Sequence, residues 1–182
     1  MEEILSFGKK MVAQKLTYAG MGNISKRVGK EIIISRRGSM LDELEGNLIA
    51  FRIDEQPDKE ASSDTPIHRE IYKKTDAKSV LHGHAPYAVA LSLIEKGNSI
   101  KPLDFESAVV LNEIPLIDSK EDKEALAKDV AAALTKNRGC IVRGHGPYTK
   151  GKTVEEAFTI VAIIEHACHV KYLVDIMKAG KE

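Results

Sequence analysis

Apolar residues recur along the chain at two spacings, one typical of helices and one typical of strands. From residue 4 to residue 16 they recur every three or four positions, which predicts an amphipathic helix that ends before Gly20 and Gly22. Two short extended runs, 23–28 and 31–35, are separated by a Gly-Lys pair and predict a β-hairpin. The first part of the chain is therefore expected to be a helix followed by an antiparallel strand pair.

The rest of the chain alternates helical and strand patterns around a polar loop at 54–64. The other expected strands cover 48–53, 79–84, 109–117 and 140–143, and the next helices begin at Pro66, Ala85 and Ser119. A capping box from Thr153 to Glu156 opens the longest helix. Its expected buried stripe contains Val154, Phe158, Val161, Ile164, Cys168, Tyr172 and Ile176. This interleaving predicts an α/β fold in which residues 1–182 form a single domain, a sandwich of one sheet and its covering helices.

Composition narrows the classes of protein to consider. The 27 Lys and Arg residues balance 27 Asp and Glu residues, so no overall basic field indicates nucleic-acid or membrane partners. With 43% hydrophobic and 30% charged residues the 182-residue chain has the composition of a soluble globule, and no run approaches the roughly 18 apolar residues of a membrane span. Its first residues are acidic, unlike those of a secretory signal. We therefore expect a cytoplasmic protein, with Cys140 and Cys168 as buried free thiols.

Three histidines stand in contexts that suit metal binding. His82 and His84 are two positions apart on an expected strand, so both imidazoles project from the same face. His145 lies between Gly144 and Gly146, which lack side chains and let the backbone approach a shared centre. Three neutral imidazoles with an open fourth position are typical of a catalytic zinc site.

Simpler interpretations exist for each histidine. A His-x-His pair is often only a polar end to a strand, so the metal hypothesis depends on the Gly-His-Gly loop and on Asp64, an acidic residue at an expected helix start. The other three histidines lie on amphipathic helices, where surface or interface positions are expected. They are His68, His166 and His169.

A second group of residues suits an anion. Three loops offer backbone N–H groups or hydroxyls, and one of them lies at a helix start, where the helix dipole favours negative charge. Each loop alone is ordinary turn material or a solvated charged pair. Together, and beside a zinc site, they predict a phosphate site. The loops are Gly20–Asn23, Arg37–Ser39 and Ser62–Ser63.

Four motifs occur here in the order and spacing of a known family. They are Gly22-Asn23-Ile24-Ser25, Ser62-Ser63-Asp64-Thr65-Pro66-Ile67-His68, His82-Gly83-His84 and Gly144-His145-Gly146. Over about residues 2–178 the chain resembles the class II aldolase and adducin-head family. The His-x-His motif with the preceding Ser-Ser-acid segment is the specific part of this resemblance.

The resemblance implies a class II aldolase-like sandwich with a mainly antiparallel central sheet. It implies zinc held by His82, His84 and His145, with a carboxylate at Asp64. It also implies a cyclic homotetramer with active sites between subunits, to which Asp104 would be donated across the interface. The substrate phosphate would be held at Gly22, Asn23, Gly38, Ser62 and Ser63.

Three departures from the family pattern bear on the chemistry. Asp64 stands where the aldolases have a longer Glu, and the Ser-Ser-Asp-Thr-Pro segment instead resembles the ribulose-5-phosphate 4-epimerases. Arg37 stands where sugar-phosphate aldolases usually carry Thr, which adds charge to the phosphate site or marks a different substrate. The sequence ends at Glu182, before the tail that supplies a catalytic Tyr in several relatives, so another group is expected to make that proton transfer.

The resemblance implies a zinc-dependent aldolase that converts a phosphorylated ketose to dihydroxyacetone phosphate and an aldehyde through a metal-stabilised enediolate. Asp64 would ligate the resting metal and then carry a proton, with Asp104 as a second acid–base. A pentulose-5-phosphate 4-epimerase would use the same bond cleavage. The adducin head offers a third alternative, a metal-free assembly module, against which the three intact histidines argue.

Overall fold

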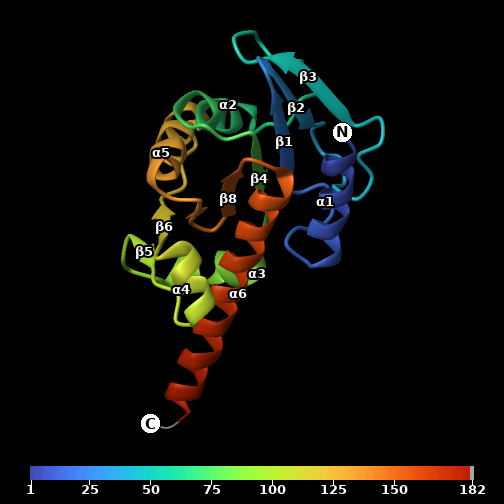
Figure 1. Cartoon of the computed structure of the whole chain (residues 1–182). Helices are drawn as coiled ribbons and strands as arrows, with labels where there is room; N and C mark the ends of the chain where they lie inside the picture. The colour runs from blue at the N-terminus through green and yellow to red at the C-terminus, as the bar shows by residue number, and fades with distance from the viewer. Residues whose placement is uncertain (181–182) are drawn as a thin grey trace.

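An eight-stranded sheet with helices on both faces forms the framework of the protein (Figure 1). The computed structural model describes residues 1–180, and within them the strand order is β3-β2-β1-β4-β8-β7-β6-β5. Each neighbouring pair is antiparallel except β6 and β7. The predicted α/β fold with a mainly antiparallel sheet is confirmed. The strands are β1 (Asn23–Val28), β2 (Glu31–Ser35), β3 (Leu48–Arg52), β4 (Ser79–His82), β5 (Ser99–Ile100), β6 (Ile114–Ile117), β7 (Gly139–Val142) and β8 (Gly146–Gly151).

Two groups of helices bury the two faces of the sheet. Helices α2 and α5 pack against each other over one face, whereas α1, α3 and α6 form the core on the other. Consecutive residues of β4 separate the two cores, because side chains alternate along a strand: Val80 belongs to the first core and Leu81 to the second. The helices are α1 (Glu2–Ala13), α2 (Thr65–Lys74), α3 (Pro86–Ile94), α4 (Phe105–Leu111), α5 (Lys123–Lys136) and α6 (Val154–Ala179).

Several boundaries differ from those predicted by sequence. The strand expected over 109–117 is wrong in its first half, because Asp104 caps a helix there by accepting the backbone N–H of Ser107 at 3.0 Å. Helix α5 begins at Lys123 rather than near Ser119, since the side chain of Asp122 caps it. Strand β4 ends at His82, earlier than predicted. Strands β5 and β8 were not predicted. The sequence of β8 begins with Gly-Pro, which is typical of a loop.

Helix α6 is only partly a core helix. Its predicted stripe is buried as far as Cys168, but Tyr172 and Ile176 are exposed, because the C-terminal half extends beyond the sheet (Figure 1). By length and composition alone, α6 would be able to cross a membrane, although charged residues such as Glu165 and Lys171 interrupt its apolar stretches. Its buried residues pack in the protein core, and Cys140 and Cys168 are buried free thiols as predicted.

Arg143 ties the turn between β7 and β8 to the end of α3. Its Nη1 donates to the carbonyl oxygens of Ser92 and Glu95 at 2.6 and 2.7 Å, and its Nη2 donates to that of Gly97. The carbonyls of Ser92 and Glu95 lie in the last turn and at the C-cap of α3, where they lack partners within the helix. One guanidinium therefore stabilises α3 and the turn that precedes His145.

We predict that Arg143→Met lowers the free energy of unfolding by about 2 kcal/mol, because it removes charge-assisted hydrogen bonds to otherwise unpaired carbonyls. Arg52→Met is the matched control, since Arg52 makes only exposed ion pairs with Asp54 and Glu55 and should cost less than about 1 kcal/mol. Urea denaturation of both variants measures the difference. Equal losses would contradict the anchoring role of Arg143.

Candidate active site

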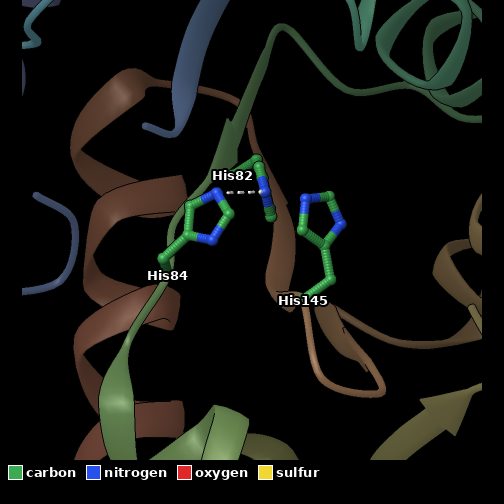
Figure 2. Close-up of side chains that lie close together, drawn as sticks. All are labelled: His82, His84 and His145. Carbon is green, nitrogen blue, oxygen red and sulfur yellow. Dashed lines mark hydrogen bonds between the residues drawn. The ribbon is translucent and has the colours of Figure 1, made fainter. Parts of the chain in front are cut away.

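The three predicted metal ligands come together from three different positions of the chain (Figure 2). His82 is the last residue of β4, His84 lies just before α3, and His145 lies in the turn between β7 and β8. The Nε2 atoms of His82 and His84 are 3.2 Å apart, and one ligand nitrogen from each of the three rings lies within 4.8 Å of the others. The prediction that His82 and His84 share a strand is wrong, yet their rings are adjacent.

Two glycines allow the backbone to bring these rings together. A Cβ atom at Gly83 would lie 2.6 Å from the carbonyl oxygen of Leu16, so this position between the two histidines accepts no side chain. Gly146 has a φ of +138°, and a Cβ there would lie 2.1 Å from the carbonyl oxygen of Gly83. Gly83 therefore allows close packing against the segment after α1, and Gly146 allows close packing of the start of β8 against Gly83.

The protonation states of the rings suit a divalent cation. The Nδ1 atom of His82 donates to the carbonyl oxygen of Pro147 at 3.0 Å, which leaves the lone pair on Nε2 free. Burial lowers the pKa of His82 and His145, and burial together with the charge of His145 lowers the pKa of His84 to about 4. All three imidazoles are therefore neutral near pH 7, the state in which histidine ligates metals. The donor set fits Zn²⁺ with three protein ligands.

Asp64 lies beside the histidines and is only 4% exposed. Its Oδ2 atom accepts hydrogen bonds from Asn23 Nδ2 and the Tyr148 hydroxyl, both at 2.9 Å, and its Oδ1 atom accepts one from Lys123 Nζ at 2.7 Å. Its Oδ2 atom is 3.9 Å from Nε2 of His82. Burial raises the pKa of this carboxyl, but the hydrogen bond and positive charge of Lys123 and the hydrogen bond from Asn23 hold the pKa well below its usual range.

The predicted anion-binding residues share one cavity of about 130 Å³ next to Asp64, His84 and His145. The loops before β1, after β2 and before α2 form its walls, so residues far apart in sequence meet there. Arg36, which also lines the cavity, is paired with Glu60, whereas Arg37 makes no ion pair with any residue that the structure describes. The predicted residues in this cavity are Gly22, Asn23, Arg37, Gly38, Ser62 and Ser63.

Two residues of the site were not predicted from the sequence. Tyr148 lies opposite His82 in the β4–β8 register, and the two rings are stacked with centroids 4.0 Å apart. Lys123 is the first residue of α5, and its Nζ also donates to Ser63 Oγ at 3.3 Å. Neither belongs to a motif. Two features of the sequence could have indicated a role for Lys123. Asp122 is a residue that caps helices and places a helix N-terminus here, and the negative charge of Asp64 otherwise lacks a partner of opposite charge.

The structure does not bring Asp104 to the histidines within one chain. Asp104 caps α4 and lines a separate cavity together with Ser107 and His166. The Nε2 atom of His166 is 4.0 Å from Oδ2 of Asp104. The predicted role of Asp104 depends on a neighbouring subunit and stays a prediction.

The expectation that His68 lies at a surface or interface is wrong. His68 is fully buried beneath the site, where its Nδ1 atom and the hydroxyl of Tyr72 each lie 2.7 Å from Ser25 Oγ. Burial lowers the pKa of His68 to about 4, so the ring is neutral. The segment before α2 thus lines the cavity, and α2 itself packs onto β1 through His68. His166, by contrast, is exposed.

Fold and site together define a protein of the class II aldolase superfamily: a mainly antiparallel α/β sandwich with a three-histidine cluster beside the cavity that the predicted anion-binding residues line. Residues 2–172 match the family model described as "Class II Aldolase and Adducin N-terminal domain". The chain belongs to this family, as the sequence motifs predicted.

Similar proteins within the family carry two different names. The chain is 30% identical over 179 residues to a methylthioribulose-1-phosphate dehydratase of Acidiphilium cryptum, covering 90% of this chain and 85% of that protein. It is 25% identical over 177 residues to an L-fuculose phosphate aldolase of Methanococcus maripaludis, covering 91% and 92%. The crystal structure of L-fuculose-1-phosphate aldolase from Thermus thermophilus superposes with a TM-score of 0.92 at 28% identity and covers 98% of this chain and 95% of that chain.

We predict that His82→Ala, His84→Ala and His145→Ala each weaken zinc binding by more than about 100-fold. Loss of only the hydrogen-bond partner of a ligand costs about 10- to 100-fold in metal affinity, and loss of the ligand itself should cost more. Two imidazoles hold a divalent cation poorly, whereas His166→Ala removes an exposed histidine outside the cluster and should retain about one zinc per chain. Competition titration against a chelator and metal analysis of the purified variants give the result. Full zinc content in the His82→Ala variant would contradict the assignment.

Proposed function

We propose that this protein is a zinc-dependent aldolase that cleaves or forms the bond between dihydroxyacetone phosphate and an aldehyde. The observation that carries the proposal is the position of three neutral histidines at the edge of a cavity lined by anion-binding groups. A phosphate in that cavity would place the adjoining carbons of a small ketose at the histidine cluster. An adducin-like assembly module would not require a histidine cluster beside such a cavity.

The phosphate subsite is built from backbone and charge. The Ser62–Ser63 segment precedes α2, whose N-terminal N–H groups favour an anion, and Asn23 and Gly22 face it from the start of β1. Arg37 adds a cation at the rim of the cavity. These groups would bind the phosphate and fix the orientation of the ketose, which supplies the part of catalysis that comes from positioning.

His82, His84 and His145 would hold the cation. Zn²⁺ bound there supplies a Lewis acid that stabilises negative charge on the substrate's carbonyl oxygen when the carbon–carbon bond breaks. Burial of His82 and the hydrogen bond from its Nδ1 to Pro147 fix the ring that lies deepest in the site.

Asp64 is the proposed proton carrier of the site. Its carboxylate lines the proposed phosphate cavity together with His84 and His145, and Lys123 binds one of its oxygens. While three donors bind it, the carboxylate has low proton affinity, so it must lose the bond from Lys123 before it takes a proton from the substrate carbon. Lys123 would thereby set when Asp64 acts as a base. Asp104 of a neighbouring subunit is proposed as the second acid–base.

A dehydratase is the second candidate function. The relative with 30% identity is named methylthioribulose-1-phosphate dehydratase, and its substrate, like that of an aldolase, is a phosphorylated ketose. The same cavity and histidines would serve both reactions, because each develops negative charge beside a ketone. The difference lies in what leaves: an aldehyde in the first case and water in the second.

We predict that the zinc-loaded protein releases dihydroxyacetone phosphate from fuculose 1-phosphate, detected with a coupled reductase assay. Methylthioribulose 1-phosphate is supplied in parallel, and mass spectrometry looks for a product lighter by one water. Loss of water without any triose phosphate would refute the aldolase proposal in favour of the dehydratase. Conversion of ribulose 5-phosphate to its 4-epimer would instead support the epimerase alternative.

A further prediction separates two roles of Asp64. If the carboxylate carries a proton, Asp64→Asn should lower turnover by about a hundred- to ten-thousandfold while zinc remains bound to the histidines. If it is only a ligand, added zinc should restore activity. Lys123→Met is a companion variant, because it keeps the carboxylate but removes the bond to Oδ1. Turnover measured across a zinc titration distinguishes the proton-carrying role from the ligand role. Full rescue of Asp64→Asn by zinc would disprove the proton-carrying role.

We also propose that the protein is a cytoplasmic homotetramer with cyclic symmetry. Large apolar side chains are exposed on α4, just before it, and on the protruding end of α6, as expected of surfaces that other copies cover. These side chains are Leu103, Phe105, Val109, Tyr172, Leu173, Ile176 and Met177.

We predict that Phe105→Glu dissociates the tetramer and lowers activity, because Phe105 is 78% exposed in the single chain and adjoins Asp104. Val28→Glu, at a 54% exposed valine beside the hairpin turn, is the control and should leave the assembly intact. Sedimentation velocity measures the state of both variants. An active wild-type monomer would count against both the assembly and the role of Asp104.

A further inference from the structure

A second cavity adjoins the histidine cluster. It has a volume of about 370 Å³ and meets the phosphate cavity at two shared residues, His84 and His145. Most of its remaining wall is apolar and comes from α3 and from the segment after α1. The other lining residues are Tyr18, Pro86, Val89, Ala90, Leu93 and Gly144.

The side chains of this second cavity offer few hydrogen bonds. Apart from the two histidines, Tyr18 supplies the only polar side chain in its lining. The N–H of Gly144 is already donated to Ser92 Oγ at 3.0 Å, and the carbonyl oxygen of Tyr18 already accepts the N–H of Met21. A hydroxyl group entering this space would lose hydrogen bonds to water with little replacement, whereas an apolar group would gain contact area.

Leu93 forms the part of the wall closest to the histidine loop. Its Cδ2 atom lies 3.1 Å from where a Cβ atom on Gly144 would stand, so the side chain extends over the residue that precedes His145. Leu93 is nevertheless 66% exposed, and its neighbour Ile94 is 72% exposed. Leu93 lines the cavity and Ile94 does not, which provides a matched pair of residues.

We propose that this second cavity binds the end of the substrate remote from the phosphate, and that this end is apolar, an alkyl or thioether group rather than a polyhydroxylated chain. The proposal rests on the proposed function only in placing the reacting carbons at the histidine cluster. A substrate that spans the cluster has its phosphate in one cavity and its remote end in the other. The two cavities differ in polarity, so the preferred substrate has one anionic and one apolar end.

The test uses zinc-loaded protein and alkyl hydroxamic acids, whose hydroxamate chelates the metal while the alkyl tail probes the space beside it. Calorimetric titration compares acetohydroxamic, butanohydroxamic and hexanohydroxamic acid. We expect affinity to rise about two- to fourfold for each added methylene, the effect of partial to full burial of the group. In Leu93→Asn, which keeps the branching at Cγ but makes the side chain smaller and polar, this rise should be largely lost. Ile94→Asn should retain it.

Each outcome bears on the proposal. A flat dependence on chain length in the wild type, as expected if a second copy of the chain fills the cavity, would overturn the apolar subsite and leave the proposed function standing. An equal loss in Leu93→Asn and Ile94→Asn would overturn it too. If acetohydroxamic acid fails to bind zinc-loaded protein, both the proposed metal centre and the subsite beside it are refuted. A clear rise in a protein without aldolase activity would support the subsite and refute the reaction.

Discussion

The pairing of β4 between β1 and β8 is the constraint on which the site depends. In this register Asn23, His82 and Tyr148 lie side by side on neighbouring strands. Backbone hydrogen bonds fix the spacing of these strands. The sheet alone therefore positions the metal-ligand candidate His82 and the hydrogen-bond donors Asn23 and Tyr148, without help from side-chain contacts. The Asp64 carboxylate then binds the two outer members of the row, which joins the start of α2 to the sheet.

Burial of that carboxylate would be costly without compensation, because a charge removed from water must be paired or hydrogen-bonded. Here the donors come from three sources: an amide on β1, a phenol on β8 and an ammonium on α5. Beneath it, Ser25 links His68 to Tyr72 in a second polar group on the same face of the sheet. The core under the site therefore includes polar side chains at positions that hydrophobic packing alone would fill with aliphatic residues.

Local pattern was sufficient to predict the hairpin, the long helix and its capping box, because each depends on residues close in sequence. The histidine cluster and the loops around the adjoining cavity were also predicted, since their motifs occupy few positions. Prediction failed where tertiary contacts decide. Val109 belongs to a β-favouring run, yet the Asp104 cap makes it helical. His68 belongs to an amphipathic helix whose polar position faces the sheet. Lys123 acquires its role only through a fold that brings residues 59 positions apart together.

The guanidinium of Arg143 also has a consequence for motion. His84 directly precedes the segment that leads into α3, and His145 follows Arg143 by two residues. Because Arg143 joins the far end of α3 to that turn, the two histidines outside the β4 strand are carried by segments bonded to each other. Local opening of one segment would require opening of the other, so both should exchange their amide hydrogens as one cooperative unit. His82, held between two strands, would keep its place while such a unit opened and closed around it.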